Sequence, residues 1–277
     1  MKLGVTLLAL AAALTAVPLA EASYIVARNA SGITLRVSGG TAIVNYRAGG
    51  ATRHVALSGA INARPPSSQS QVSFKAVYGV GAKGGGACLP YDGPALPFLV
   101  TACKAPDGSY WALQNWQRLM PNYGGASAAA ELSASHWSGE LPKLEVWLDY
   151  KYAKWQHLFG RLTYNGQGVY GFKATSRGNP LDSHGRNLYL DTLNSHYGGG
   201  WRRENSFLTH NPTGAFCYGF FPHKGAPGVG ERYRLSVQGP GVTPIVSWEG
   251  DALPGYDAAL QAEMTSLLRS FNDRQCR

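Results

Sequence analysis

The chain has 277 residues, of which 15% are charged, 35 are glycine and 15 are tyrosine, and its formal net charge is +9. Globular domains usually contain about 25% charged residues and about 7% glycine, so this composition favours short strands joined by tight turns. After residue 22 no stretch reaches the roughly 20 apolar residues that span a bilayer, which excludes a membrane-spanning helix there.

The first 22 residues have the pattern of a secretory signal peptide. Lys2 gives a short basic start, an apolar run extends from Leu3 to Leu19, and Ala20-Glu21-Ala22 has the small-x-small form of a cleavage site. A membrane anchor is the alternative, but Thr and Pro residues interrupt the run, which is shorter than a spanning helix needs. We therefore expect cleavage after Ala22 and a secreted, extracellular protein of 255 residues.

Charge is distributed unevenly along the chain. Between Ser23 and Tyr91 there is no Asp or Glu, while seven cations occur: Arg28, Arg36, Arg47, Arg53, Arg64, Lys75 and Lys83. This asymmetry favours an anionic surface or polymer as the partner. The alternative is that these cations form ion pairs with carboxylates from the rest of the folded chain.

Residues 33–60 predict a three-stranded β meander. Three short alternating runs are separated by Gly39-Gly40 and Gly49-Gly50. The polar, proline-containing residues 65–71 indicate a linker or long loop. We expect residues 23–64 to form a basic meander, a candidate subdomain, and residues 72–277 to form the main β domain.

The four cysteines are Cys88, Cys103, Cys217 and Cys276. In an exported chain an even number predicts disulfides, and three sets of pairs are possible. Cys88 with Cys103 is favoured because a separation of about 15 residues closes a local loop, which stabilises by about 3 kcal/mol in the chain-entropy model. Cys217 would then pair with Cys276. No C-x-x-C spacing is present, so we predict no metal site.

Apolar and polar residues also alternate along several stretches of the main domain. Residues 144–152 have the period of a half-buried strand, and Asn165-Gly166 is the strongest short hairpin signal available. Further strands are expected at residues 187–193, 215–221 and 231–237, while residues 110–120 fit a helix or a strand equally well. Residues 256–272 predict an amphipathic helix that packs on the sheet, because one apolar stripe contains Tyr256, Leu260, Met264, Leu267 and Phe271.

Residues 173–210 contain the highest density of chemically capable side chains, although no familiar catalytic motif is present anywhere in the chain. If the protein is an enzyme, the candidate catalytic residues are Asp191, Glu204 and His210. The candidate binding residues in this stretch are Arg186, Asn187, Tyr189, Trp201 and Arg202. The alternative is an ordered loop pair without chemistry, in which residues 198–200, three glycines, form a flexible tip.

Glu145 and Trp147 are further candidate binding residues, because they share a strand face with Asp149 and flat rings stack on sugars. Four residues at about 3.3 Å each separate the Cα atoms of Glu145 and Asp149 by roughly 13 Å, too far for a glycosidase pair. The alternative is a polar face whose tryptophan covers the sheet.

These observations predict a mainly β protein, an antiparallel sandwich or jelly-roll-like fold with a C-terminal helix packed on the sheet. The expected function is a secreted, non-catalytic binding module for an anionic or polysaccharide surface of the cell envelope or extracellular space. The alternative is a polysaccharide hydrolase or lyase that uses carboxylates and histidines of residues 173–210, and a structural envelope protein is a third hypothesis. No cofactor is predicted, and nucleic acid is disfavoured because the basic residues are dispersed. The sequence does not indicate an oligomeric state.

Overall fold

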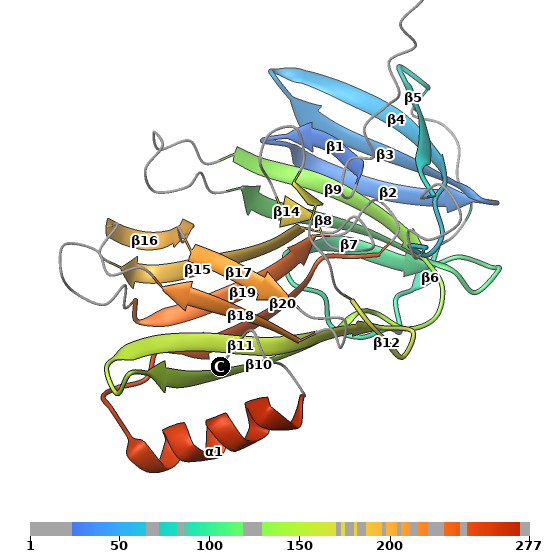
Figure 1. The fold of residues 1–277 in the computed structure, drawn as a ribbon. Helices are drawn as coiled ribbons and strands as arrows, with labels where there is room; N and C mark the ends of the chain where they lie inside the picture. The colour runs from blue at the N-terminus through green and yellow to red at the C-terminus, as the bar shows by residue number, and fades with distance from the viewer. Residues whose placement is uncertain are drawn as a thin grey trace, which may run out of the picture.

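The computed structural model describes residues 24–64, 72–81, 86, 88–118, 129–169, 173–174, 180–181, 187–195, 198–203, 206–210, 215–220, 230–238 and 243–271. In this part of the chain there are twenty β-strands, all paired in antiparallel sheets, and one α-helix (Figure 1). The prediction of a mainly β protein is therefore confirmed. The predicted signal peptide, the linker at residues 65–71 and Cys276 lie outside the described residues.

Two sheets occupy the N-terminal half. One contains, in spatial order, β1 (Tyr24–Arg28), β9 (Ala129–Trp137), β8 (Tyr110–Arg118), β7 (Leu99–Lys104) and β6 (Leu89–Pro90). The other contains β2 (Ser31–Ser38), β3 (Thr41–Ala48), β4 (Ala51–Gly59) and β5 (Phe74–Tyr78). The three-stranded meander is confirmed as β2 to β4. β5, which follows residues 65–71, pairs with β4, so chain on both sides of the predicted linker enters one sheet.

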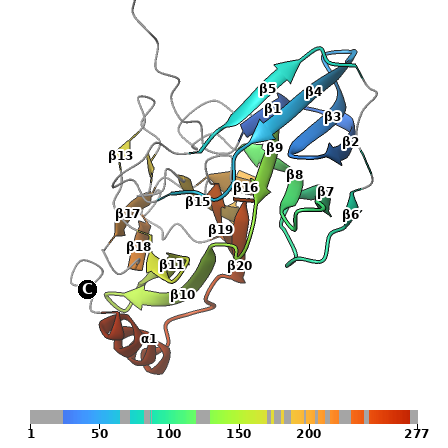
Figure 2. The same cartoon turned by 90° about the vertical axis from the view of Figure 1, so that its right-hand side faces the viewer.

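The strands of the second sheet form because apolar and polar side chains alternate along them. Val44 and Val55 lie opposite each other and are fully buried. They belong to a core that also contains Trp111 and Leu132 from the first sheet. One face of the β2–β5 sheet thus packs on the first sheet, and the residues between the buried ones point to its other face (Figure 2).

The C-terminal half contributes two larger sheets and a short hairpin. One sheet has the order β16 (Gly198–Arg203), β15 (Asn187–Ser195), β19 (Arg232–Gln238) and β20 (Val246–Asp251). The other has the order β10 (Lys143–Lys151), β11 (Trp155–Tyr164), β18 (Ala215–Phe220) and β17 (Ser206–His210), with β12 (Gln167–Gly168) beside β11. β13 (Lys173–Ala174) and β14 (Pro180–Leu181) form the hairpin. A second core joins the two larger sheets through residues such as Leu158, Leu190 and Leu235.

The helix α1 (Ala258–Ser270) confirms the prediction of an amphipathic C-terminal helix packed on the sheet. The side chain of Asp257 caps its first turn, since one carboxylate oxygen accepts the backbone N–H groups of Ala259 and Leu260. Met264 and Leu268 are buried against the β10–β11 sheet. No helix of the described residues has the length and apolar character needed to cross a membrane.

Residues 198–200, which the alternative without chemistry placed in a flexible tip, instead begin β16, which pairs with β15. Gly198 and Gly200 have φ angles of 122° and 75°, which glycine adopts readily. The side-chain oxygen of Asn194 accepts the Gly200 N–H at 2.8 Å and fixes this turn. Glycine here allows a tight connection between two strands.

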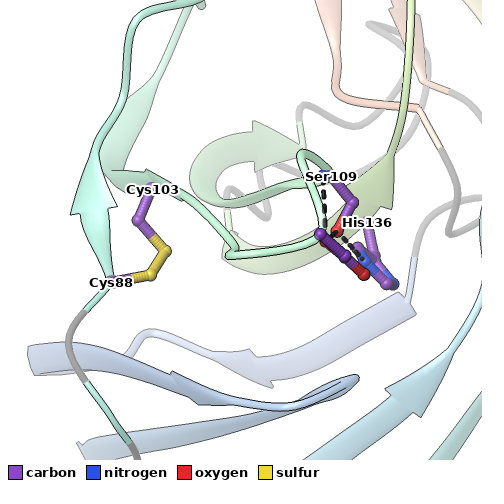
Figure 3. The surroundings of a disulfide bond; sticks show 5 residues. Cys88, Cys103, Ser109 and His136 are labelled. Carbon is purple, nitrogen blue, oxygen red and sulfur yellow. Dashed lines mark hydrogen bonds between the residues drawn. A yellow bond between two sulfur atoms is a disulfide. The ribbon is translucent and has the colours of Figure 1, made fainter.

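The disulfide between Cys88 and Cys103 is present, with the Cα atoms 5.5 Å apart (Figure 3). It joins the region of β6 to β7, as the loop-closure argument predicted. Cys217 also takes part in a disulfide. Its pairing with Cys276 stays a prediction. Disulfides are typical of proteins from oxidising compartments.

Candidate functional site

The central strand β15 places Asp191 between two arginines. Asp191 lies directly opposite Arg203 on β16 and Arg234 on β19, so the three side chains share one face of the sheet. Arg203 donates from Nε to Asp191 Oδ1 at 2.6 Å, and Arg234 donates from Nη2 to Asp191 Oδ2 at 3.4 Å. The carboxylate is fully buried, with 0% of its surface exposed.

Aromatic rings enclose both guanidinium groups. Arg203 lies 4.1 Å from the centre of the Tyr189 ring and 5.3 Å from that of Trp116, and these two ring centres are 5.1 Å apart. Arg234 lies 4.2 Å from the centre of the Trp201 ring. Such contacts stabilise a cation whose hydration has been removed. The structure therefore brings together three sequence-predicted residues: Asp191, Tyr189 and Trp201.

The candidate residues taken from the sequence did not include Arg234 or Trp116. No local pattern singles them out, because their proximity depends on the register of β15 with its two neighbours and on the packing of β8 against them. The arrangement suits positioning rather than acid–base chemistry, since both oxygens of Asp191 accept hydrogen bonds from guanidinium groups. Among the described residues, Arg234 Nε is buried without a hydrogen-bond partner.

The other candidates of residues 173–210 are dispersed or not described. Arg202 is half-buried and donates to the backbone oxygen of Gly199 in its own hairpin. Arg186 and Glu204 lie outside the described residues, and for Asn187 and His210 only the backbone, in β15 and β17, is described. The catalytic hypothesis built on Asp191, Glu204 and His210 stays a prediction.

Trp147 and Glu145 lie on the face of β10 that α1 covers. The Trp147 ring stacks on Phe159, with 5.7 Å between ring centres, and contacts Phe271 after the end of the helix. Glu145 forms ion pairs with Lys143 at 3.0 Å and Arg161 at 3.2 Å. This face therefore contributes to packing, and the glycan contact predicted for these two residues would have to displace the helix.

All seven tryptophans of the chain are described, and each of them is buried or half-buried. Trp111, Trp116 and Trp137 are each only 1% exposed. The structure consequently offers no exposed indole ring on which a sugar could stack. A ligand surface must use other chemistry.

The strongest surface feature is the outer face of the β2–β5 sheet, here called the basic face. It contains the exposed side chains of Arg36, Arg47 and Lys75, whose neighbours along each strand point into the core. Between them a row of polar groups crosses three strands: Thr34, Asn45 and His54 lie side by side. Asn45 donates to Thr34 at 3.0 Å and accepts from His54 at 2.7 Å.

Four cations of the acid-free segment are not neutralised by the part of the chain that the structure describes. A fifth, Arg28 of β1, pairs with Glu131 at 3.1 Å. Within the ranges that the structure describes, Arg36, Arg47, Arg53 and Lys75 form no ion pair. The sheet itself carries no Asp or Glu, because none occurs between Ser23 and Tyr91. The expectation that folding would pair these cations is therefore not met at these four positions.

A buried Ser–His pair lies in the first sheet (Figure 3). Ser109 Oγ is 2.9 Å from His136 Nε2, and His136 Nδ1 donates to the Gly59 backbone oxygen of β4 at 2.8 Å. Ser109 Oγ also donates to Asp107 at 2.6 Å. Ser109 and His136 are each only 3% exposed, so a substrate cannot reach them. The group instead ties β9 to β4 across the two sheets.

Two buried histidines predict how stability depends on pH. Burial lowers the pKa of His136 and of His157 from the ordinary value of 6.5, although Asp149 opposes the shift at His157. The unfolded chain therefore binds more protons, so stability is complete above about pH 6.5 and is lost as the pH falls through the folded pKa values. We expect urea midpoints to fall between pH 7.5 and 5.5.

Replacing His136 with Asn removes one titrating group and should reduce this pH dependence relative to the wild type. Carboxylates contribute equally to both proteins, so the difference between the two curves isolates the imidazole. Parallel curves would show that His136 titrates in the folded protein as it does in the unfolded one.

In the described residues, no three His, Cys, Asp or Glu side chains come together in a group that could hold a metal ion. No protein-family model, curated protein or solved structure matches the chain. The basic face is consequently the feature on which a functional proposal can be built.

Proposed function

We propose that the protein is a secreted, non-catalytic binding module that holds an anionic polysaccharide on the basic face. The observation that carries the proposal is a sheet without carboxylates whose exposed Arg36, Arg47 and Lys75 have no ion-pair partner within the described chain. Unpaired surface cations of one sign attract anionic polymers and raise their rate of association.

The spacing of the cations suits a polymer better than a small anion. Arg36 on β2 and Lys75 on β5 are three strands apart, which corresponds to roughly 14 Å between Cα atoms. Arg47 lies four residues along β3 from Ile43, the residue opposite Arg36, a distance of roughly 13 Å. Charges so far apart do not converge on one phosphate or carboxylate. They can contact successive charged units of a chain that lies across the sheet.

The remaining groups of the basic face support a polysaccharide. Hydroxyl and amide groups flank a row formed by Ile43, Ala56 and Val77, which lie opposite one another on adjacent strands. Such a mixture can hydrogen-bond sugar hydroxyls beside an apolar strip. Apart from His54 this face has no ring, whereas proteins that bind single-stranded nucleic acid use aromatic stacking platforms. Nucleic acid therefore remains disfavoured.

The proposal also includes secretion of the protein and a sandwich-like fold of its N-terminal half. Removal of residues 1–22 and secretion are supported by the disulfide, which is typical of oxidising compartments. The packing of the β2–β5 sheet on the β1–β9–β8–β7 sheet supports a sandwich-like arrangement of this half.

Retention on immobilised polygalacturonate and dextran sulfate at low and high salt tests the proposal. The triple variant Arg36→Gln, Arg47→Gln, Lys75→Gln should bind at least roughly tenfold more weakly than the wild type, if each lost contact contributes about 0.5–1 kcal/mol. The matched control is Lys143→Gln, Arg232→Gln, Arg269→Gln, which removes the same charge from exposed positions elsewhere. Equal retention of the two variants, or no retention of the wild type at low salt, would refute the proposal.

A further inference from the structure

The hairpin between β10 and β11 turns through two residues in the left-handed region. Tyr152 and Ala153 have φ angles of 54° and 52°. The N–H of Lys154 donates to the backbone oxygen of Lys151 at 3.1 Å, which closes the turn around them. Two consecutive residues with positive φ also occur in type I′ turns, which favour Asn-Gly because most side chains are strained in this region.

The same chain uses the favourable residues in its next hairpin. Asn165 and Gly166, between β11 and β12, have φ angles of 51° and 71°. Both loops therefore place two consecutive residues at positive φ, although the first has three residues between its paired strand ends and the second has two. Only the second has the residues that stabilise such a conformation. A residue with a strained backbone is retained when its side chain has a function that outweighs the loss of stability. Such residues are concentrated at functional sites.

The side chain of Tyr152, in the strained turn, is largely exposed to solvent. Tyr152 is 88% exposed, more than any other large apolar side chain of the described residues. Lys151 and Lys154 flank it, and the Lys154 ammonium lies 4.7 Å from the centre of the Trp155 ring. Tyr256, 51% exposed, packs against Tyr150 two residues before the turn. The hairpin end thus presents aromatic rings with cations beside them.

We infer that the side chains of Tyr152 and Lys154, here called the tyrosine tip, form a second contact site for an acidic sugar unit of the polysaccharide. This inference rests on the proposed function. A phenol ring stacks on the apolar face of one sugar, and the Lys154 ammonium matches a carboxylate or sulfate on that sugar or its neighbour. An anionic membrane fits less well, because Ala153 is the only other apolar residue within the turn and a single ring with two lysines gives a weak anchor.

The tyrosine tip and the basic face lie at opposite ends of the molecule in both views (Figures 1 and 2). One short oligosaccharide therefore cannot reach both sites. A long polymer, or polymers packed in a matrix, can engage both, and the second contact then occurs at high effective concentration. Loss of the tip should weaken binding to long chains more than binding to short oligomers.

The test uses the full chain with the double variant Tyr152→Asn, Ala153→Gly. This change installs the favoured turn, so its urea midpoint should rise, corresponding to a roughly tenfold larger folding constant. Its affinity for long polygalacturonate should fall roughly three- to tenfold, because the stacking ring is gone. Ala153→Gly alone relieves strain and keeps the ring, so it should raise stability and leave affinity within about twofold of wild type.

The outcomes of these measurements distinguish the tyrosine tip, the basic face and membrane binding from one another. A double variant that is more stable and binds more weakly supports the tyrosine tip. Unchanged affinity of the double variant, while the basic-face triple variant loses binding, overturns the tip and leaves the proposed function standing. A wild type that binds no polyanion overturns both. Tyr152-dependent binding to vesicles containing phosphatidylserine, without binding to polygalacturonate or dextran sulfate, would also overturn the sugar assignment.

Discussion

Replacing Asp191 with Asn should lower the free energy of unfolding by about 3–5 kcal/mol, the range for breaking a buried ion pair by removing one partner. The variant keeps the shape of the side chain but removes its charge. Arg234, about 7% exposed, would then remain buried without the carboxylate to which it donates. Equilibrium denaturation in urea, followed by tryptophan fluorescence, measures the change, since Trp116 and Trp201 pack directly on the guanidinium groups beside Asp191.

The matched control is Asp251→Asn in the same sheet. Asp251 pairs with Arg232 at 3.1 Å, but the two side chains are 84% and 45% exposed. An exposed pair contributes roughly 0–1 kcal/mol, so this change should be nearly neutral. Adding Arg234→Met to Asp191→Asn should recover part of the loss because it removes one uncompensated charge. Equal effects of Asp191→Asn and Asp251→Asn would mean that water reaches the Asp191 cluster.

Removing the disulfide between Cys88 and Cys103 is expected to lower stability by about 3 kcal/mol. The bridge closes a loop of about 15 residues, and its loss increases the entropy of the unfolded chain. Alanine is the suitable replacement at both positions, because Cys103 is 5% exposed in the apolar core and a serine hydroxyl would be buried there.

Two measurements distinguish the contributions of the two disulfides to stability. One is the unfolding of the wild type under reducing conditions, and the other is the unfolding of the Cys88→Ala, Cys103→Ala variant. Reduction of the wild type also opens the bond at Cys217, so it should destabilise more than the double variant does. If the double variant unfolds at the same urea concentration as the wild type, the Cys88–Cys103 bond does not stabilise the fold.

Elements with a local signal could be predicted from the sequence. The meander of β2 to β4 follows from alternation between Gly-Gly turns, and α1 follows from an apolar stripe of period 3.6. Each of these patterns extends over about ten to fifteen consecutive residues. It can therefore be recognised without knowing which residues distant in the sequence pack against it. The strand β8 was ambiguous because its pattern, with buried residues on both faces, has no clear period.

The candidate site depended on contacts that no local pattern contains. Asp191 meets Arg234 from 43 residues away, and Trp116, which packs beside Tyr189, comes from a different sheet. Trp147 was predicted to contact a ligand, yet α1 covers it, because the sequence indicated a packed helix without indicating which strands lie beneath. The acid-free segment was visible in the sequence, but only the structure shows that Arg36, Arg47 and Lys75 share one face and form no ion pair with the residues described.

The salt dependence of affinity for long polygalacturonate tests the central claim most directly. If the basic face binds the polymer through charge, the wild-type affinity should fall steeply as the salt concentration rises. The variant Arg36→Gln, Arg47→Gln, Lys75→Gln should bind more weakly at low salt and show a clearly shallower slope, whereas Lys143→Gln, Arg232→Gln, Arg269→Gln should keep the wild-type slope. Identical slopes for all three proteins would contradict the assignment of binding to the basic face.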